Sequence, residues 1–172
     1  MIPTKNPTNF SGGSINYIGV DNGIGGGIVI LNKKLEIIEK HIMPTIGTTR
    51  KEYDLVRIAK LLNRKDVKVF LEKAQPRYRD GSKQAFKTGY GYGALQGILT
   101  ALQIPHILIS PKQWQKKVFE GLASDDTKQA SLLFCSRTWP KEDWTPTLRS
   151  QKAHDGMTDA ACIAYYGVTN GL

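Results

Sequence analysis

The sequence lacks the features that mark membrane-spanning and disulfide-stabilised proteins. No part of the 172 residues approaches the run of about 18 apolar residues that a transmembrane helix needs. The N-terminus has neither the charged start nor the apolar run of a secretory signal peptide. There are only two cysteines, Cys135 and Cys162, in apolar surroundings, where we expect small buried side chains. We therefore expect a soluble, intracellular protein with no membrane partner.

Acidic residues are also scarce. The chain has 15 Asp and Glu against 24 Lys and Arg, which gives a formal net charge of +9. Such a surplus favours a polyanionic partner whose binding weakens with salt, although a basic surface that serves only solubility is the alternative. Residues 1–14, rich in Pro, Gly, Ser, Thr and Asn, should form a flexible tail, and residues 15–172 a single domain.

The hydrophobic pattern predicts an α/β fold. Expected strands cover 16–21, 28–31, 35–43, 67–71 and 104–109. Expected helices cover 51–63, 82–103, a segment opened by Ser110-Pro111, 127–138 and 155–166. Short turns between the first three strands predict an antiparallel meander, and 139–151 should be a mobile loop. This order predicts a mixed five-stranded sheet flanked by helices on both faces.

Four carboxylates stand at the ends of apolar segments: Asp21 in IGVDNG, Glu72 in VFLEK, and Asp155 and Asp159 in HDGMTDAACIA. Unpaired acids are costly at such places, so a positive partner is expected. Asp155 and Asp159 share a helix face and repel each other unless a cation lies between them. Hard oxygen ligands favour Mg²⁺ or Mn²⁺. An acidic metal site in a basic protein indicates an enzyme that cuts nucleic acid.

Each acid also has a simpler explanation. Asp155 suits a helix N-cap, Glu72 a surface ion pair with a nearby basic residue, and Asp21 a turn. None of these explains Asp159, which is followed at once by the apolar AACIA. Together, four acids at one predicted sheet edge favour a metal site.

Basic residues form two clusters. The first follows Glu72 and mixes positive and aromatic side chains, which suits phosphate contact and base stacking: Arg77, Tyr78, Arg79, Lys83 and Lys87. The second is Lys112, Lys116 and Lys117. Either cluster could instead be a solvated face, and only a position beside the acids favours DNA.

Gly89, Gly93 and Gly97 recur every four residues in one predicted helix. Each costs about 1 kcal/mol relative to Ala in a helix, so this stripe needs a compensating contact. The helix either lies tightly on the sheet or meets its own copy across a two-fold axis.

Three blocks of the sequence resemble RuvC-like Holliday junction resolvases, and are most similar to the phage-type branch. They are IGVDNGIGGGIVIL, LEKAQPRYRDGSKQAFKTGYGYGALQGILTALQIPHILISPKQWQKK and KAHDGMTDAACIAYYG, within residues 16–167. The resemblance implies a ribonuclease H-like fold and a homodimer that resolves four-way or branched DNA by paired symmetric nicks. It further implies a role in recombination or phage DNA processing, in the cytoplasm or nucleoid of a bacterial host.

The resemblance also assigns residues. Asp21, Glu72, Asp155 and Asp159 would be catalytic and would hold two Mg²⁺ or Mn²⁺ ions in each active site. Possible catalytic support would come from His154, Lys116 and Lys128, DNA contacts from the two basic clusters, and the dimer interface from Gly89, Gly93 and Gly97. The sequence departs from bacterial relatives in two places. The last two acids are four residues apart instead of three, and Gln75-Pro76 stands where those relatives carry an aromatic wedge, for which Tyr78 or Phe86 would substitute.

Three other functions remain open. A ribonuclease H-like nuclease would cut RNA–DNA hybrids. An actin-like module would use DNGIGGG to bind the phosphates of ATP, but the second half that such proteins need is not found, and we expect no nucleotide cofactor. A non-catalytic junction-binding protein would not need the four acids.

Overall fold

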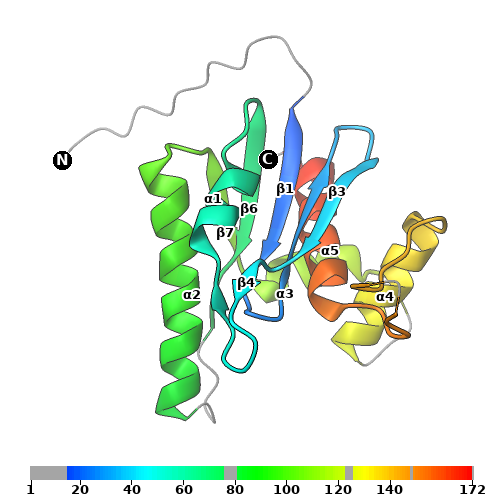
Figure 1. The fold of residues 1–172 in the computed structure, drawn as a ribbon. Helices are drawn as coiled ribbons and strands as arrows, with labels where there is room; N and C mark the ends of the chain where they lie inside the picture. Colours follow the sequence, from blue (N-terminus) through cyan, green and yellow to red (C-terminus); the bar gives the residue numbers. More distant parts are fainter. Residues whose placement is uncertain (1–14, 76–80, 123–125, 148, 172) are drawn as a thin grey trace.

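The centre of the protein is a five-stranded sheet with the order β3-β2-β1-β6-β7 (Figure 1). The computed structural model describes residues 15–75, 81–122, 126–147 and 149–171, so the expected tail at 1–14 lies outside it. The strands are β1 (Asn16–Asp21), β2 (Gly27–Leu31), β3 (Ile37–Ile42), β6 (Val67–Glu72) and β7 (His106–Ile109). β1, β2 and β3 pair antiparallel, whereas β6 and β7 continue the sheet parallel to β1. The predicted mixed sheet is confirmed.

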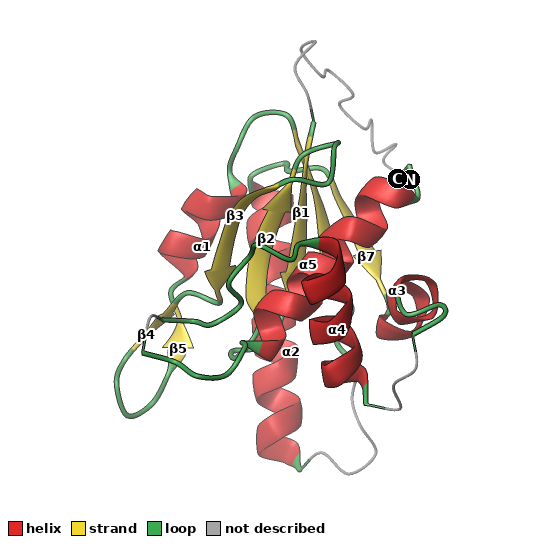
Figure 2. Ribbon diagram, turned by 90° about the vertical axis from the view of Figure 1, so that its right-hand side faces the viewer, coloured by secondary structure: helices red, strands yellow, loops and turns green. Residues whose placement is uncertain are grey.

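Helices cover both faces of this sheet (Figure 2). They are α1 (Leu55–Leu62), α2 (Ser82–Ala101), α3 (Pro111–Val118), α4 (Thr127–Thr138) and α5 (Asp155–Thr169). Side chains alternate along β1, so Ile18 and Val20 join the core under α1 and α2, whereas Tyr17 joins the core under α5. Both faces of the central strands are therefore buried.

Helix α5 lies directly on β1 because Gly19 has no side chain. A Cβ at Gly19 would lie 2.0 Å from the carbonyl oxygen of Ala160, well inside contact distance. The same holds at the start of α5, where a Cβ at Gly156 would lie 2.4 Å from the carbonyl oxygen of Gly25. Gly26 and Gly156 even form an isolated β-bridge. Gly19 and Gly156 therefore allow the close packing of α5.

The predicted helix over 51–63 is wrong at its start. Residues 52 and 53 form a short strand, β5 (Glu52–Tyr53), which pairs with β4 (Thr45–Ile46) in a separate two-stranded ribbon. The helix begins only at Leu55, because the Asp54 side chain accepts a hydrogen bond of 3.0 Å from the backbone N–H of Arg57 and caps it. The ribbon was not predicted, since each of its strands has two residues.

The other boundaries differ by a few residues. β3 begins at Ile37 instead of 35 because the Asn32 side chain accepts hydrogen bonds from the N–H groups of Lys34 and Glu36 and closes a longer turn. Helix α2 ends at Ala101, before Gln103 with its positive φ of 54°. β7 begins at residue 106 instead of 104, and α5 continues to residue 169 instead of 166.

The segment 139–151 was predicted to be a mobile loop. That prediction did not include the burial of its two tryptophans. Trp139 and Trp144 are 9% and 4% exposed, and their ring centroids lie 5.9 Å apart. The Nε1 atom of Trp139 donates a hydrogen bond of 2.7 Å to the carbonyl oxygen of Leu35, which anchors the segment to the turn before β3. Cys135 and Cys162 are buried free thiols, as expected. Within the described ranges, no helix is long and apolar enough to cross a bilayer.

Candidate active site

The first two acids stand side by side at one edge of the sheet. β1 and β6 run parallel with Val20 opposite Leu71, so the next residues, Asp21 and Glu72, end neighbouring strands at the same edge. Asp21 accepts a hydrogen bond of 3.1 Å from the backbone N–H of Gly23. Burial nevertheless raises the pKa of the Asp21 carboxyl above its ordinary value.

The two acids of α5 reach the same region. The bridge between Gly26 and Gly156 holds the first turn of α5 against the turn that follows Asp21. Burial raises the pKa of Asp159 to about 7, and the negative charges of Asp21 and Asp155 add to the increase. The negative charges of Asp21 and Asp155 therefore act on Asp159, although Asp21 lies in a distant part of the chain.

Two neutral side chains orient these acids. The Nε1 atom of Trp114, on α3, donates a hydrogen bond of 2.9 Å to Oε1 of Glu72. The hydroxyl of Ser131, on α4, donates to Oδ1 of Asp159 and thereby opposes the increase in its pKa. Sequence reasoning missed both roles, because the partners are 42 and 28 residues apart and neither donor stands in a recognisable motif.

Lys128 is the basic residue that the structure places against the acids. Its Nζ lies 3.0 Å from Oδ2 of Asp155, and that carboxylate raises the pKa of the Lys128 ammonium. Both side chains are more than half exposed, so the pair adds little to stability. Lys116 lies on the exposed face of α3. Lys128 therefore lies beside one of the four acids, and its catalytic role stays a prediction.

His154 has a structural task that the sequence did not indicate. It is the N-cap of α5, where Asp155 was the alternative, and its Nδ1 accepts a hydrogen bond of 3.3 Å from the N–H of Met157. Burial lowers the pKa of its imidazole, which favours the neutral ring. A neutral ring that accepts at Nδ1 carries its proton on Nε2, which makes that nitrogen a hydrogen-bond donor.

The donor set fits a hard divalent cation. Carboxylates that are desolvated and close to like charges are stabilised by a cation. Among the described residues, however, no three His, Cys, Asp or Glu side chains are grouped closely enough to enclose a metal ion. Mg²⁺ seldom needs such a cage, because it is usually held by one or two carboxylates together with waters and substrate phosphates. An open arrangement of carboxylates is compatible with Mg²⁺ binding of this kind.

The predicted DNA-binding residues lie on two helices where the structure describes them. Lys83 and Lys87 are exposed in the first turns of α2, and Lys112 and Lys117 are exposed on α3. Lys117 also lies 3.7 Å from the carboxylate of Glu120, in an exposed pair. Arg77, Tyr78 and Arg79 lie outside the described residues.

The glycine stripe of α2 does not pack on the sheet, so that alternative is wrong. A Cβ built at Gly89, Gly93 or Gly97 would meet no atom within 4 Å. Gly91 is the glycine that does allow close packing, since its Cβ would lie 2.3 Å from the hydroxyl oxygen of Tyr53. The stripe therefore faces away from the rest of the described chain.

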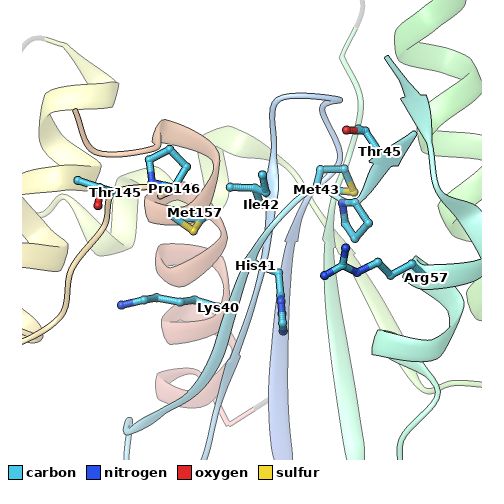
Figure 3. A pocket seen from close by; sticks show the side chains of 10 residues that line it. Lys40, His41, Ile42, Met43, Thr45, Arg57, Thr145, Pro146 and Met157 are labelled. Carbon is cyan, nitrogen blue, oxygen red and sulfur yellow. The ribbon is translucent and has the colours of Figure 1, made fainter. Parts of the chain in front are cut away.

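A separate pocket of about 310 Å³ surrounds the end of β3 (Figure 3). Its basic side chains are Lys40, His41 and Arg57. Lys40 forms an ion pair with Glu142, and His41 lies 2.9 Å from the carboxylate of Glu39. The charge of Lys40 is thus already balanced by an acid, which weakens the case for an anion site there.

Two solved structures of RuvC from Thermus thermophilus are similar to this chain. RuvC in complex with a Holliday junction substrate superposes with a TM-score of 0.64 at 17% identity, over 91% of this chain and 94% of that chain. A further RuvC structure gives a TM-score of 0.60 at 19% identity, over 91% and 97%. The fold is RuvC-like. The predicted ribonuclease H-like architecture is thereby confirmed, whereas no protein-family model and no curated protein matches the sequence.

Proposed function

We propose that this protein is a divalent-metal-dependent endonuclease that resolves four-way or otherwise branched DNA. The observation that supports this most directly is the open arrangement of acids from β1, β6 and α5 at one edge of a RuvC-like sheet. Asp21 and Glu72 end neighbouring strands, and Asp21 and Asp155 both raise the pKa of Asp159. One similar structure is a complex with a Holliday junction, and the net charge of +9 suits a polyanionic substrate.

Asp21, Glu72, Asp155 and Asp159 would hold two Mg²⁺ or Mn²⁺ ions. Bound there, such ions would activate water and stabilise the leaving oxygen of a phosphodiester. Trp114 and Ser131 would keep Glu72 and Asp159 in the orientation needed for binding. Lys128 would contact a phosphate beside Asp155, because its exposed ammonium already lies at that carboxylate.

We further propose a homodimer whose two active sites make paired, symmetric nicks on opposed strands. The exposed glycine face of α2 supports this arrangement, since it lets two copies of the helix approach closely. The resemblance of three sequence blocks to the phage-type branch is the ground on which we propose a role in recombination or phage DNA processing.

A cleavage assay with three substrates tests the proposed function. Labelled four-way junction, linear duplex and RNA–DNA hybrid are incubated with Mg²⁺ and with wild type, Asp21→Asn or the surface control Glu120→Gln. We expect wild type and Glu120→Gln to nick the junction, and Asp21→Asn to be inactive. Asp159→Asn should bind the junction without cutting it. Nicking by Asp21→Asn contradicts the mechanism, and preferred cutting of the hybrid contradicts the substrate.

A further inference from the structure

A buried asparagine joins the two strands that carry the first two acids. The ladder between β1 and β6 ends at the pair Val20 and Leu71, one residue before Asp21 and Glu72. Asn22 directly follows Asp21 and is only 7% exposed. Its Nδ2 atom donates a hydrogen bond of 2.6 Å to the carbonyl oxygen of Glu72. A side chain therefore continues the connection between the strands at the point where the backbone ladder stops.

Tyr53, on the β4–β5 ribbon (Figure 2), holds the main chain of Asn22. Its hydroxyl donates a hydrogen bond of 2.9 Å to the carbonyl oxygen of Asn22. Helix α2 confines this hydroxyl, because a Cβ at Gly91 would lie 2.3 Å from its oxygen. Burial raises the pKa of Tyr53 to about 12, and the negative charge of Asp21 adds to the increase. The hydroxyl therefore keeps its proton at neutral pH and lies near enough to Asp21 to be affected by its charge.

The end of β6 is also held from its other side. The backbone N–H of Lys73 donates a hydrogen bond of 2.7 Å to the carbonyl oxygen of Ile109, at the end of β7. Trp114 fixes the carboxylate of Glu72 but not its distance from β1. A site that holds metal ions needs its ligands within about 0.5 Å of the working geometry. The bond from Asn22 to Glu72 is the contact that relates one acidic strand end to the other.

We propose that Asn22 and Tyr53 are positioning residues that set the separation of Asp21 and Glu72 for metal binding. This inference rests on the proposed nuclease function and adds to it a task for the β4–β5 ribbon, which carries Tyr53 to the acids. Both residues act through the main chain next to the acids and need not touch an ion. A role confined to stabilising the turn after β1 would lower the free energy of unfolding without changing the affinity for metal.

Binding of Mn²⁺ in the absence of DNA tests this inference without cleavage, with the electron paramagnetic resonance signal of the free ion as the readout. Tyr53→Phe keeps the ring and loses the donor, and Asn22→Ala loses the link to Glu72. The dissociation constant of each variant should rise by about ten-fold or more, as for other residues that orient metal ligands. Tyr90→Phe removes the same hydroxyl from a ring that is 52% exposed and should bind as wild type does. Trp139→Phe loses a hydrogen bond of 2.7 Å elsewhere and should also keep the affinity.

The outcomes separate the positioning network from the nuclease. Unchanged Mn²⁺ affinity in Tyr53→Phe or in Asn22→Ala overturns the positioning proposal, as does an equal loss in Trp139→Phe, which would trace the effect to stability. If wild type still nicks the junction, the nuclease function survives that result. Affinity that depends on Asn22 and Tyr53, in a protein that nicks no junction, supports the positioning and overturns the nuclease. A wild type that binds no Mn²⁺ overturns both. In a nuclease, raising the Mn²⁺ concentration should restore most of the nicking by Tyr53→Phe, and failure of this rescue contradicts a role in metal binding.

Discussion

The indole of Trp114 donates its only hydrogen bond to the carboxylate of Glu72, over 2.9 Å. Trp114 is 1% exposed and belongs to the core between α3 and the sheet. A residue whose ring is fixed by packing can hold a carboxylate in one orientation at little entropic cost. The core beneath the sheet edge thus determines the geometry of an acid at its surface.

Replacing Trp114 by Phe should therefore reduce activity more than stability. A smaller aromatic ring remains in the core, but the donor to Glu72 is lost, and we expect nicking to fall by about 10- to 100-fold. The control is Trp139→Phe, which removes the donor to Leu35 on a different part of the surface. It should lower the free energy of unfolding by about 1–3 kcal/mol without changing the rate of nicking. Equal nicking by both variants would show that Trp114 does not position Glu72.

Asp159 should make the stability of the protein depend on pH. Its pKa is about 7 in the folded protein against an ordinary value of 3.8, so the folded state binds more protons between these values. The free energy of unfolding should therefore fall as the pH rises from about 4 to about 7 in EDTA. Mg²⁺ should restore stability most strongly at the upper end of this window. Urea titrations at pH 5 and 7, with and without Mg²⁺, measure both effects.

Asp159→Asn is the control for this pH dependence. It removes the titrating group, so the fall in stability across the window should become smaller, and the gain from Mg²⁺ at pH 7 should shrink. A variant with the same pH profile as wild type would mean that Asp159 has an ordinary pKa.

The exposed glycine face of α2 predicts how a larger side chain on that face affects dimerisation. A Cβ at Gly93 would meet no atom within 4 Å in the described chain, and Leu is a better helix former than Gly by about 1 kcal/mol. The monomer should therefore be at least as stable as wild type, while the mass measured by light scattering should drop from dimer to monomer. Gly91→Leu, on the face against Tyr53, should instead destabilise the fold. An unchanged mass for Gly93→Leu contradicts the proposed interface.

Gly19→Ala should separate α5 from β1. Its Cβ would lie 2.0 Å from the carbonyl oxygen of Ala160, and relief of such overpacking typically costs about 1–3 kcal/mol. Because α5 carries two of the acids, nicking should fall as well. Gly25→Ala adds the same methyl group where no atom lies within 4 Å and should leave both stability and nicking unchanged. Chemical denaturation and the junction assay measure the two effects.

Local pattern determined the elements of this protein. Alternating and continuous apolar runs predicted the strands of the main sheet, and Asp21 and Glu72 could be placed at strand ends because a strand ends where its apolar run ends. The same reasoning failed for the β4–β5 ribbon, whose two-residue strands have no periodicity to read. It also misjudged residues 139–151, since nothing local indicates that Trp139 and Trp144 are buried.

Tertiary structure decided which side chains serve the acids. The contacts of Trp114 with Glu72 and of Ser131 with Asp159 join different helices and strands, so no spacing in the sequence encodes them. Asp21 and Asp159 likewise influence each other only because Gly19 and Gly156 let α5 approach β1 at backbone distance. The sequence by itself therefore determined the kinds of residue that carry the proposed chemistry. Their pKa values and their partners depend on burial and on contacts across the sheet edge, which exist only in the folded chain.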